Sequence, residues 1–300
     1  MNISKIELAN SFLDNKLMFE CKNIGILHLT GKDSFKFLNG ISSNEVKETK
    51  NELSISTLIL TNKGRILFNI EIYSDSSNSM YILHHLSQKR ELLEYLAKYR
   101  MSYEVNIEDL DRNLKIFKGH KMSTDIIFKN FRSAQILEES LLVYLVPKDK
   151  VESINKSQTN QEHYNAWRIL NGVPTSQKEL TTKTIPIEAN MWSSISFTKG
   201  CYIGQETIAR IHYRGKIKRS LACLEIQGKL NKDLDVFLTK DKKVGSISNY
   251  CYFIKDKSTL ALGYIDDEHN YEGNNLIVSN ANCKVLKNNY KNENEKLINI

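Results

Sequence analysis

Residues 199–206 have the sequence KGCYIGQE, and residues 207–210 continue it as TIAR. Ile208 and Ile211 are three residues apart, which predicts the apolar face of a helix. Cys201 therefore comes just before a helix start. Because the amides at a helix N-terminus carry partial positive charge, this position favours a thiolate and predicts a lowered thiol pKa. The alternative is a turn that holds a buried structural cysteine.

The residues beside Cys201 strengthen the functional interpretation. Lys199 adds a full positive charge, so Cys201 and Lys199 are the candidate catalytic residues. The two flanking glycines give the backbone freedom to present the thiol, and the first turns of the helix carry charges spaced for an ion pair. These supporting residues are Gly200, Gly204, Gln205, Glu206 and Arg210.

Length and apolar content set the class of protein. A chain of 300 residues exceeds one usual compact core, which predicts two or three domains. No apolar run approaches the roughly 20 residues that span a bilayer, so we expect no membrane segment. Residues 1–19 lack the features of secretory and transit peptides, and we expect a cytoplasmic protein.

The chain is basic, with a formal charge of +7 and a pI near 8.9. A basic surface attracts nucleic acid, because phosphates release counterions when they bind cations. The alternative is compositional drift, since lysine, asparagine and isoleucine are abundant along the whole length. Drift is the favoured interpretation, and contact with RNA is the weaker one.

Cysteine and histidine spacing argues against a disulfide framework and against a bound metal. The cysteines are odd in number, widely spaced and form no CxxC pair. The histidines show no HxH or HExxH spacing. The five cysteines are Cys21, Cys201, Cys223, Cys251 and Cys283.

Hydrophobic periodicity predicts an α+β fold in the amino-terminal half. Strands are predicted at 24–29, 53–60 and 65–73, the last two as a hairpin. Two helices are expected, with Asp33 and Ser87 as their N-caps. After Lys216 the chain changes to short strands separated by turns, which is typical of a small antiparallel barrel. These strands are predicted at 221–226, 243–247, 260–265 and 276–278.

One polar residue and one pair of aromatic residues have two interpretations each. Asn69 lies on the mixed face of a predicted strand, where a solvated position and a ligand contact are equally supported. Tyr164 and Trp167 are three residues apart on a predicted helix, 162–170. They are core residues in the favoured interpretation, and a stacking surface for a planar heterocycle in the other.

The motif at 199–206, with Phe197 before it and Arg210 after it, resembles the signature of the YgfZ family of folate-binding iron–sulfur proteins, relatives of the glycine-cleavage T-protein. The resemblance extends through Tyr164 and the segments 172–174, 185–190 and 215–221, and more weakly over 31–46 and 58–73. Residues 186–206 look most similar to the mitochondrial-type branch for [4Fe-4S] assembly.

The resemblance implies a fold, a ligand and partners. Residues 1–217 would form a folate-binding, T-protein-like region of two interleaved α+β subdomains around a central cavity, followed by a β-barrel at 218–290 and a polar tail at 291–300. The ligand would be tetrahydrofolate or another reduced folate, bound weakly. The partners would be [4Fe-4S] client proteins and iron–sulfur carriers, with an indirect link to tRNA modification. The implied folate-binding residues are Tyr164, Asn69, Glu188 and Trp167.

The sequence departs from the T-protein pattern at two positions. Phe68 and Asn69 stand where the T-protein has paired aspartates, so a carboxylate needed for aminomethyl transfer is missing. Leu170 stands where relatives carry a glutamate that binds the pterin edge, and leucine supplies no acceptor.

Two functions therefore follow from the resemblance. The first is a non-enzymatic factor for assembly or repair of [4Fe-4S] proteins that acts through the Cys201 thiol, with a transient contact to cluster iron. The alternative is a tetrahydrofolate-dependent one-carbon (aminomethyl) transferase with an altered site. Asn69 favours the first, because a neutral amide cannot replace a carboxylate base.

Overall fold

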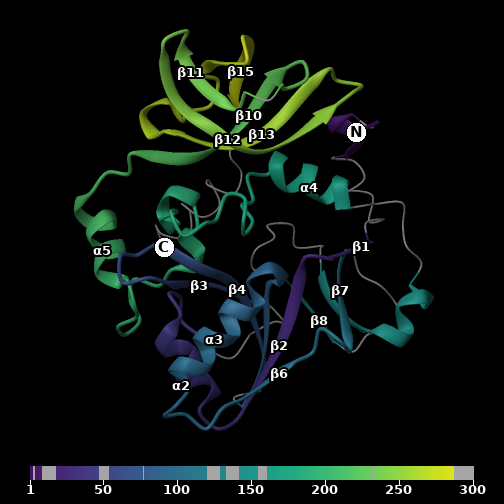
Figure 1. The fold of residues 1–300 in the computed structure, drawn as a ribbon, viewed down its shortest axis with the longest axis vertical. Coiled ribbons are helices and arrows are strands. Elements are labelled where there is room, and N and C mark those ends of the chain that lie inside the picture. The colour runs from purple at the N-terminus through teal and green to yellow at the C-terminus, as the bar shows by residue number, and fades with distance from the viewer. Residues whose placement is uncertain are drawn as a thin grey trace. The chain divides into compact units, whose positions relative to one another are not determined.

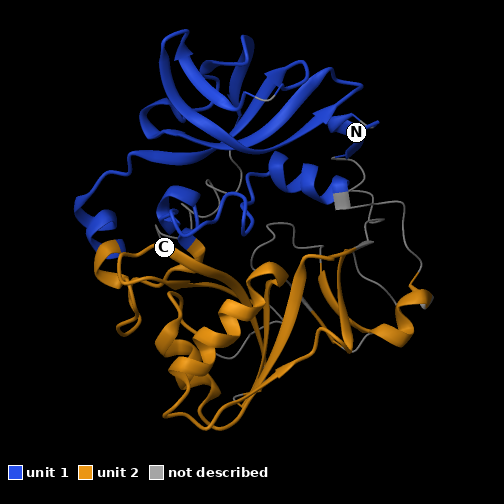
Figure 2. Ribbon diagram, viewed as in Figure 1, with its two compact units in different colours: residues 1–14, 161–192, 208–300 blue, residues 15–160, 193–207 orange. Residues whose placement is uncertain are grey.

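The computed structural model describes residues 1–2, 4–8, 18–46, 54–76, 78–119, 129–132, 142–154, 161–231 and 233–286. The expected polar tail at 291–300 lies outside these residues. The chain forms two compact units and passes between them more than once (Figure 2). Unit 1 comprises Met1–Asp14, Gln161–Trp192 and Ile208–Ile300, and unit 2 comprises Asn15–Asn160 and Ser193–Thr207.

Unit 2 contains a five-stranded antiparallel sheet in the order β3-β4-β5-β2-β6. The expected hairpin between β3 and β4 is confirmed: the Thr61 amide donates to the Arg65 carbonyl at 2.8 Å, and Gly64 turns with a φ of 68°. The strands are β2 (Ile24–Thr30), β3 (Ile55–Leu60), β4 (Ile66–Ser76), β5 (Ser79–His85) and β6 (Asn106–Asp109) (Figure 1).

One face of this sheet packs against helices α2 (Ser34–Ile41) and α3 (Lys89–Tyr99). The alternation along β4 explains why, because every second side chain points to this face. The resulting core contains Phe37, Leu38, Phe68, Ile70, Ile72, Leu92 and Leu96.

Asp33 occupies the N-cap position of α2 as predicted, but neither of the two predicted side-chain caps is formed, and the N-cap of α3 is Gln88 in place of Ser87. The Asp33 side chain makes no capping bond to α2, and its Oδ2 instead accepts from the Glu104 amide at 2.9 Å. Helix α3 begins at Lys89 after the 3-10 turn Leu86–Gln88, whose N-cap is His85. A tertiary donor thus takes up the Asp33 carboxylate, and the amide of Ser87 itself donates to the His85 side chain.

A second antiparallel sheet of unit 2 has the order β1-β7-β9-β8. Its core is a small cluster around Phe117 and Tyr144, closed by Ile154 beyond the 3-10 turn Lys148–Ser153. The strands are β1 (Met18–Glu20), β7 (Leu114–Gly119), β8 (Lys129–Arg132) and β9 (Leu142–Pro147).

Unit 1 contains the predicted antiparallel barrel, which is closed in the order β10-β13-β12-β11-β14-β15. Closure removes the unpaired strand edges that an open sheet would present. The four predicted barrel strands are confirmed, and β11 and β15 were missed. The strands are β10 (Arg219–Gln227), β11 (Asp235–Thr239), β12 (Lys242–Phe253), β13 (Ser258–Asp266), β14 (Asn275–Val278) and β15 (Ala281–Leu286).

Helix α4 (Gln161–Leu170) is joined to the barrel through a buried ion pair between Arg168 and Glu179. Their side chains are 4% and 0% exposed, and Arg168 Nη1 lies 3.1 Å from Glu179 Oε2. Ser248 of β12 donates to the other carboxylate oxygen at 3.3 Å, and the Tyr264 hydroxyl of β13 donates to the Glu179 carbonyl at 2.9 Å. The pair therefore orients α4 on the barrel wall.

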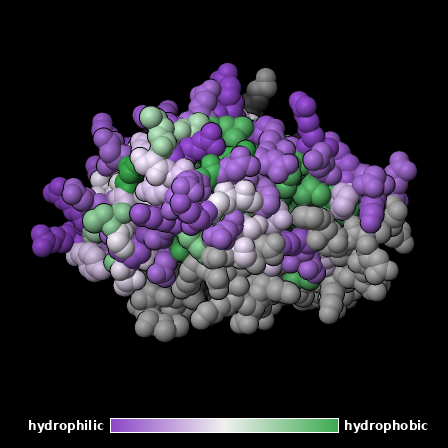
Figure 3. Space-filling view, turned by 90° about the horizontal axis from the view of Figure 1, so that it is seen from below, coloured by the Kyte–Doolittle hydropathy of each residue, from purple (hydrophilic) through white to green (hydrophobic). Residues whose placement is uncertain are grey.

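The described residues on the face drawn in Figure 3 are mostly hydrophilic, with small apolar patches between them. Over the described ranges, the structure contains no helix that is long and apolar enough to cross a bilayer.

Candidate functional site

Cys201 lies on an exposed loop of unit 2, directly before helix α5 (Gln205–Arg214). The helix predicted after the motif is therefore confirmed. The Cys201 side chain is exposed, whereas Tyr202 beside it is buried. The loop presents its thiol to solvent while the neighbouring ring anchors it.

Lys199 holds this loop against the end of helix α2. Its ammonium donates to three backbone carbonyls, those of Asn39 at 2.6 Å, Ser42 at 2.8 Å and Asn44 at 2.9 Å. An ammonium has three donors, so all of them are used here. The last carbonyls of a helix carry partial negative charge and lack partners within the helix, which explains why a cation binds there.

Burial lowers the pKa of Lys199 from its ordinary value to about 8, and the nearby Glu45 carboxylate opposes this shift. The ammonium also lies 5.5 Å from the centre of the Tyr202 ring, a cation–π distance. The contacts of Lys199 are thus structural ones that position the loop. Its expected effect on the pKa of the thiol stays a prediction.

A set of serine and asparagine hydrogen bonds provides a second attachment, between residues 193–194 before the cysteine loop and residues 43, 44 and 56 of unit 2. Ser43 Oγ donates to the Ser194 carbonyl at 2.6 Å, and Asn44 Nδ2 donates to the Ser193 carbonyl at 2.9 Å. The hydroxyls of Ser56 and Ser194 lie 2.7 Å apart. The sequence interpretation missed these residues, because nothing in residues 43–44 or 56 indicates a partner that is 138 to 151 positions away.

Of the two motif glycines, only Gly204 has a conformation that requires glycine. Its φ is +87°, and a Cβ there would lie 2.5 Å from the Thr61 carbonyl oxygen and 3.1 Å from Gly64 Cα. Gly200 has no such constraint, since an added Cβ would meet no described atom within 4 Å. Gly204 therefore brings the start of α5 close to the β3–β4 turn.

The remaining motif residues form the start and exposed face of α5. The Gln205 amide donates to the Tyr202 carbonyl at 3.3 Å. Burial raises the pKa of Tyr202 to about 12, and its hydroxyl has no hydrogen-bond partner among the described atoms. The ion pair expected between Glu206 and Arg210 is not formed, although both side chains are described and exposed.

The other four cysteines are far less accessible. Cys21, Cys223 and Cys283 are buried, and burial raises the pKa of each thiol to about 12. Cys251 is half-buried, and burial raises its pKa as well. All five cysteines lie within the described residues and are free, and Cys201 is the exposed thiol among them.

The residues expected to bind folate are divided between the units. In unit 1, Tyr164 and Trp167 lie on α4 with their rings stacked on each other at 6.1 Å and 19°, and Trp167 is only 7% exposed. Glu188 lies on the 3-10 turn Pro186–Ala189, where its Oε2 accepts from Arg219 Nε and Nη2, both at 3.2 Å. Asn69 is a half-buried residue of β4 in unit 2.

Within the described ranges, no three histidine, cysteine, aspartate or glutamate side chains are grouped to hold a metal ion. Cys201 is therefore a single candidate ligand and not part of a preformed metal centre in that part of the chain.

The fold matches a known class of transferase structure. The crystal structure of the glycine cleavage system aminomethyltransferase T from Bartonella henselae superposes with a TM-score of 0.76, covering 96% of this chain and 91% of that one, at 12% identity. The α+β architecture with a carboxy-terminal barrel, expected from the resemblance, is confirmed. The central cavity stays a prediction.

Sequence comparison gives the nearer relationship, although no protein-family model matches. The mitochondrial iron-sulfur cluster assembly factor IBA57 homolog of Neurospora crassa is 25% identical over 225 residues, 66% of this chain and 51% of that protein. Its namesake in Dictyostelium discoideum is 24% identical over 251 residues, 69% of this chain and 62% of that protein. The tRNA-modifying protein YgfZ of Hamiltonella defensa subsp. Acyrthosiphon pisum is 30% identical over 225 residues, 66% of each chain.

The chain is thus a homologue of the IBA57 and YgfZ proteins, as the motif at 199–206 predicted. It spans about half to three fifths of the length of the two IBA57 proteins, with coverages of 51% and 62%.

Alkylation tests the exposure of Cys201. We expect iodoacetamide at about neutral pH to modify Cys201 in the folded chain and to leave the four other thiols intact, because the thiolate is the reacting form and burial suppresses it. Peptide mass mapping locates the label, and unfolding in urea exposes all five sites as a control. Labelling of Cys223 or Cys283 as fast as Cys201 would contradict the assignment.

Lys199→Met tests the attachment of the loop. Losing three charge-assisted hydrogen bonds should lower the free energy of unfolding by about 1–3 kcal/mol at pH 7, measured by urea unfolding with circular dichroism. Lys63→Met, at an exposed lysine of unit 2, is the matched control and should change little.

The difference in the free energy of unfolding between wild type and Lys199→Met should depend on pH. Lys199 has a folded pKa of about 8 against an ordinary 10.5, so between these values the unfolded chain keeps a proton that the folded chain has released. The contribution of Lys199 to the free energy of unfolding therefore rises with pH. The difference between wild type and Lys199→Met should grow from about pH 7 to about pH 10, and a constant or shrinking difference would refute the shift.

Proposed function

We propose that this chain is an accessory protein for the assembly or repair of [4Fe-4S] proteins, including iron–sulfur enzymes that modify tRNA, and that it acts through the Cys201 thiol. The names of its IBA57 and YgfZ homologues support the kind of process. The observation that carries the proposal is a single exposed thiol on a loop that Lys199 ties to α2.

The chemistry of one thiol limits what it does with a cluster. The Cys201 sulfur donates an electron pair to a cluster iron, and the proton it loses goes to water; the steps reverse on release. Thiolates are soft ligands that suit iron–sulfur clusters, and each cluster needs several of them. Since one cysteine supplies one ligand, the remaining ligands come from a client or carrier protein, and the contact is transient.

The partners in this proposal are therefore [4Fe-4S] client proteins and iron–sulfur carriers. The location we propose is the cytoplasm, although the names of the two IBA57 homologues assign those proteins to mitochondria.

Folate is proposed as an accessory ligand, bound weakly. In the present arrangement Trp167 is buried and leaves little ring surface for stacking, and the Glu188 carboxylate is engaged by Arg219. Leu170 offers no acceptor to a pterin edge. These residues fit a folate poorly, so the proposed chemistry of the Cys201 thiol does not depend on it.

One observation keeps the aminomethyltransferase alternative open. Glu71 lies two residues after Asn69 on β4, hence on the same face of the sheet. Its carboxylate is 3% exposed and accepts a hydrogen bond from Ser54 Oγ at 2.5 Å. A buried carboxylate at this position is the group that could replace the one missing at Asn69.

Cys201→Ser tests the proposed function in a strain that lacks the protein. We expect the variant to fold, because the change in volume is small, and to restore less than about a tenth of the activity of several [4Fe-4S] enzymes relative to wild type. Cys251→Ser, which removes a half-buried thiol, is the matched control and should rescue fully. Full rescue by Cys201→Ser would overturn the thiol mechanism.

A folate assay separates the two candidate functions. We expect purified protein to bind a reduced folate at roughly millimolar concentration in calorimetry and to transfer no aminomethyl group. Turnover that is lost in Glu71→Gln would establish the transferase alternative and refute the non-enzymatic one. Turnover that persists in Glu71→Gln would refute Glu71 as the substitute carboxylate.

A further inference from the structure

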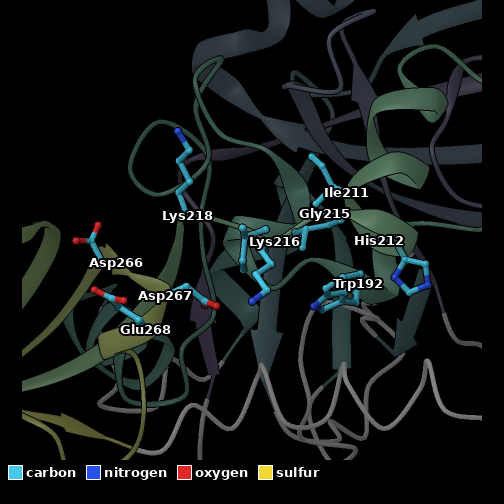
Figure 4. Close-up of a pocket in the computed structure, with 11 residues that line it drawn as sticks. Trp192, Ile211, His212, Gly215, Lys216, Lys218, Asp266, Asp267 and Glu268 are labelled. Atoms are coloured by element: carbon cyan, nitrogen blue, oxygen red, sulfur yellow. The ribbon is translucent and has the colours of Figure 1, made fainter.

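A pocket of about 760 Å³ lies within unit 1, beside the end of α5 (Figure 4). It combines three kinds of group: aromatic rings, exposed lysines, and a run of three acidic residues. The lining residues are Ile187, Trp192, Ile211, His212, Gly215, Lys216, Ile217, Lys218, Asp266, Asp267 and Glu268.

The aromatic wall consists of Trp192 and His212. The two rings lie 5.5 Å apart at 63°, edge to face, so that each supports the position of the other. Trp192 is half-buried and lines the pocket. Fixed aromatic rings in a pocket are surfaces on which a nucleobase stacks.

Lys216 and Lys218 supply positive charge from the segment that follows α5. Both side chains are exposed, and neither makes an ion pair or side-chain hydrogen bond with any described residue. In the view of Figure 4 the Lys216 ammonium lies between the Asp267 carboxylate and the Trp192 ring, whereas Lys218 points away from them. Lys216 is thus placed to bind a phosphate next to a base on Trp192.

The charge extends beyond the pocket along the chain. Residues 207–224 contain five lysine and arginine residues and no acidic residue. Tyr213 in the same segment is 68% exposed. A run of cations with interleaved exposed aromatic rings is the pattern of a surface that follows a single-stranded nucleic acid. This segment therefore carries a net positive charge of its own.

The acidic side of the pocket selects against a simple anion. Asp266 ends β13 and is half-buried, and its carboxylate forms no hydrogen bond or ion pair with another described side chain. Asp267 Oδ1 accepts a hydrogen bond from Ser220 Oγ at 2.6 Å, and Glu268 Oε1 lies 4.0 Å from Lys242 Nζ. A carboxylate repels phosphate but accepts hydrogen bonds from hydroxyl groups, as acidic residues do for the ribose 2′-hydroxyl in dinucleotide sites.

We propose that this pocket binds a short stretch of single-stranded RNA, with one base against Trp192, a phosphate on Lys216 and the ribose hydroxyl of a neighbouring nucleotide near Asp266, which Figure 4 shows on the other side of Asp267. Neighbouring phosphates of the strand follow the basic segment around Arg214 and Lys218. This goes beyond the proposed iron–sulfur function, which involves the Cys201 thiol and requires no contact with nucleic acid. The 2′-hydroxyl distinguishes RNA from DNA at such a site.

The test measures binding of a fluorescent single-stranded RNA of about a dozen nucleotides by anisotropy, against DNA of the same sequence. We expect the full-length protein to bind RNA at least about fivefold more tightly than DNA. Lys216→Glu should weaken RNA binding about tenfold or more, and Lys240→Glu, an equal charge change at an exposed lysine elsewhere in unit 1, at most about twofold. Thermal unfolding confirms that both variants fold.

Asp266→Ala isolates the contact with the sugar. Removing the acceptor should bring the ratio of RNA to DNA affinity close to one, whereas loss of a negative charge alone would strengthen both equally and leave the ratio unchanged. An unchanged ratio overturns the assignment of Asp266. Equal weakening by Lys216→Glu and Lys240→Glu, or no binding of RNA, overturns the site itself.

Adenosine monophosphate distinguishes the two sources of a ribonucleotide. If the site follows an RNA strand, the mononucleotide should bind far more weakly than the oligonucleotide, because most of the phosphate contacts are absent. If it binds as tightly as the oligonucleotide, the occupant is a free nucleotide and the RNA assignment is overturned.

Discussion

The ammonium of Lys199 is the contact on which the cysteine loop depends. It joins two segments of unit 2 that are about 160 positions apart, by donating to the three carbonyls at the end of α2. A helix end needs such donors, and a loop needs an anchor, so one side chain satisfies both requirements. The serine and asparagine bonds between residues 43–56 and 193–194 act on the same junction. Because these contacts hold the backbone before Cys201, the thiol can be exposed while the loop that carries it keeps its position.

Burial, more than the local motif, separates Cys201 from the other thiols. Cys21, Cys223 and Cys283 lie in apolar surroundings that raise their pKa to about 12, which keeps them protonated and inert. A protein that handles iron or sulfur gains from this separation, since a second reactive thiol would compete for the same cargo. The placement of five free cysteines is therefore consistent with a role for one of them.

The T-protein fold is retained here with a different set of polar groups. A TM-score of 0.76 at 12% identity describes the backbone and carries no statement about chemistry, because one fold hosts many functions. On β4, Asn69 presents an amide, and Glu71 presents a carboxylate two residues later on the same face. In unit 1, Glu188 is held by Arg219 and Trp167 is buried on α4. The shared backbone therefore leaves the chemistry to the side chains that this chain presents.

The sequence by itself predicted β2, β3, β4, four of the six barrel strands and the helix after Cys201, because alternation of apolar residues reflects burial over a few neighbouring positions. It also determined the homology, through the residues of the motif at 199–206. Only the tertiary structure decided what Lys199 contacts, why Gly204 and not Gly200 requires glycine, and which residues meet around Trp192. It showed that the Asp33 carboxylate accepts from the Glu104 amide and not from α2, and that α3 begins after a 3-10 turn whose N-cap is His85. These features depend on groups far apart in the chain, and local periodicity carries no information on which distant donor reaches which acceptor.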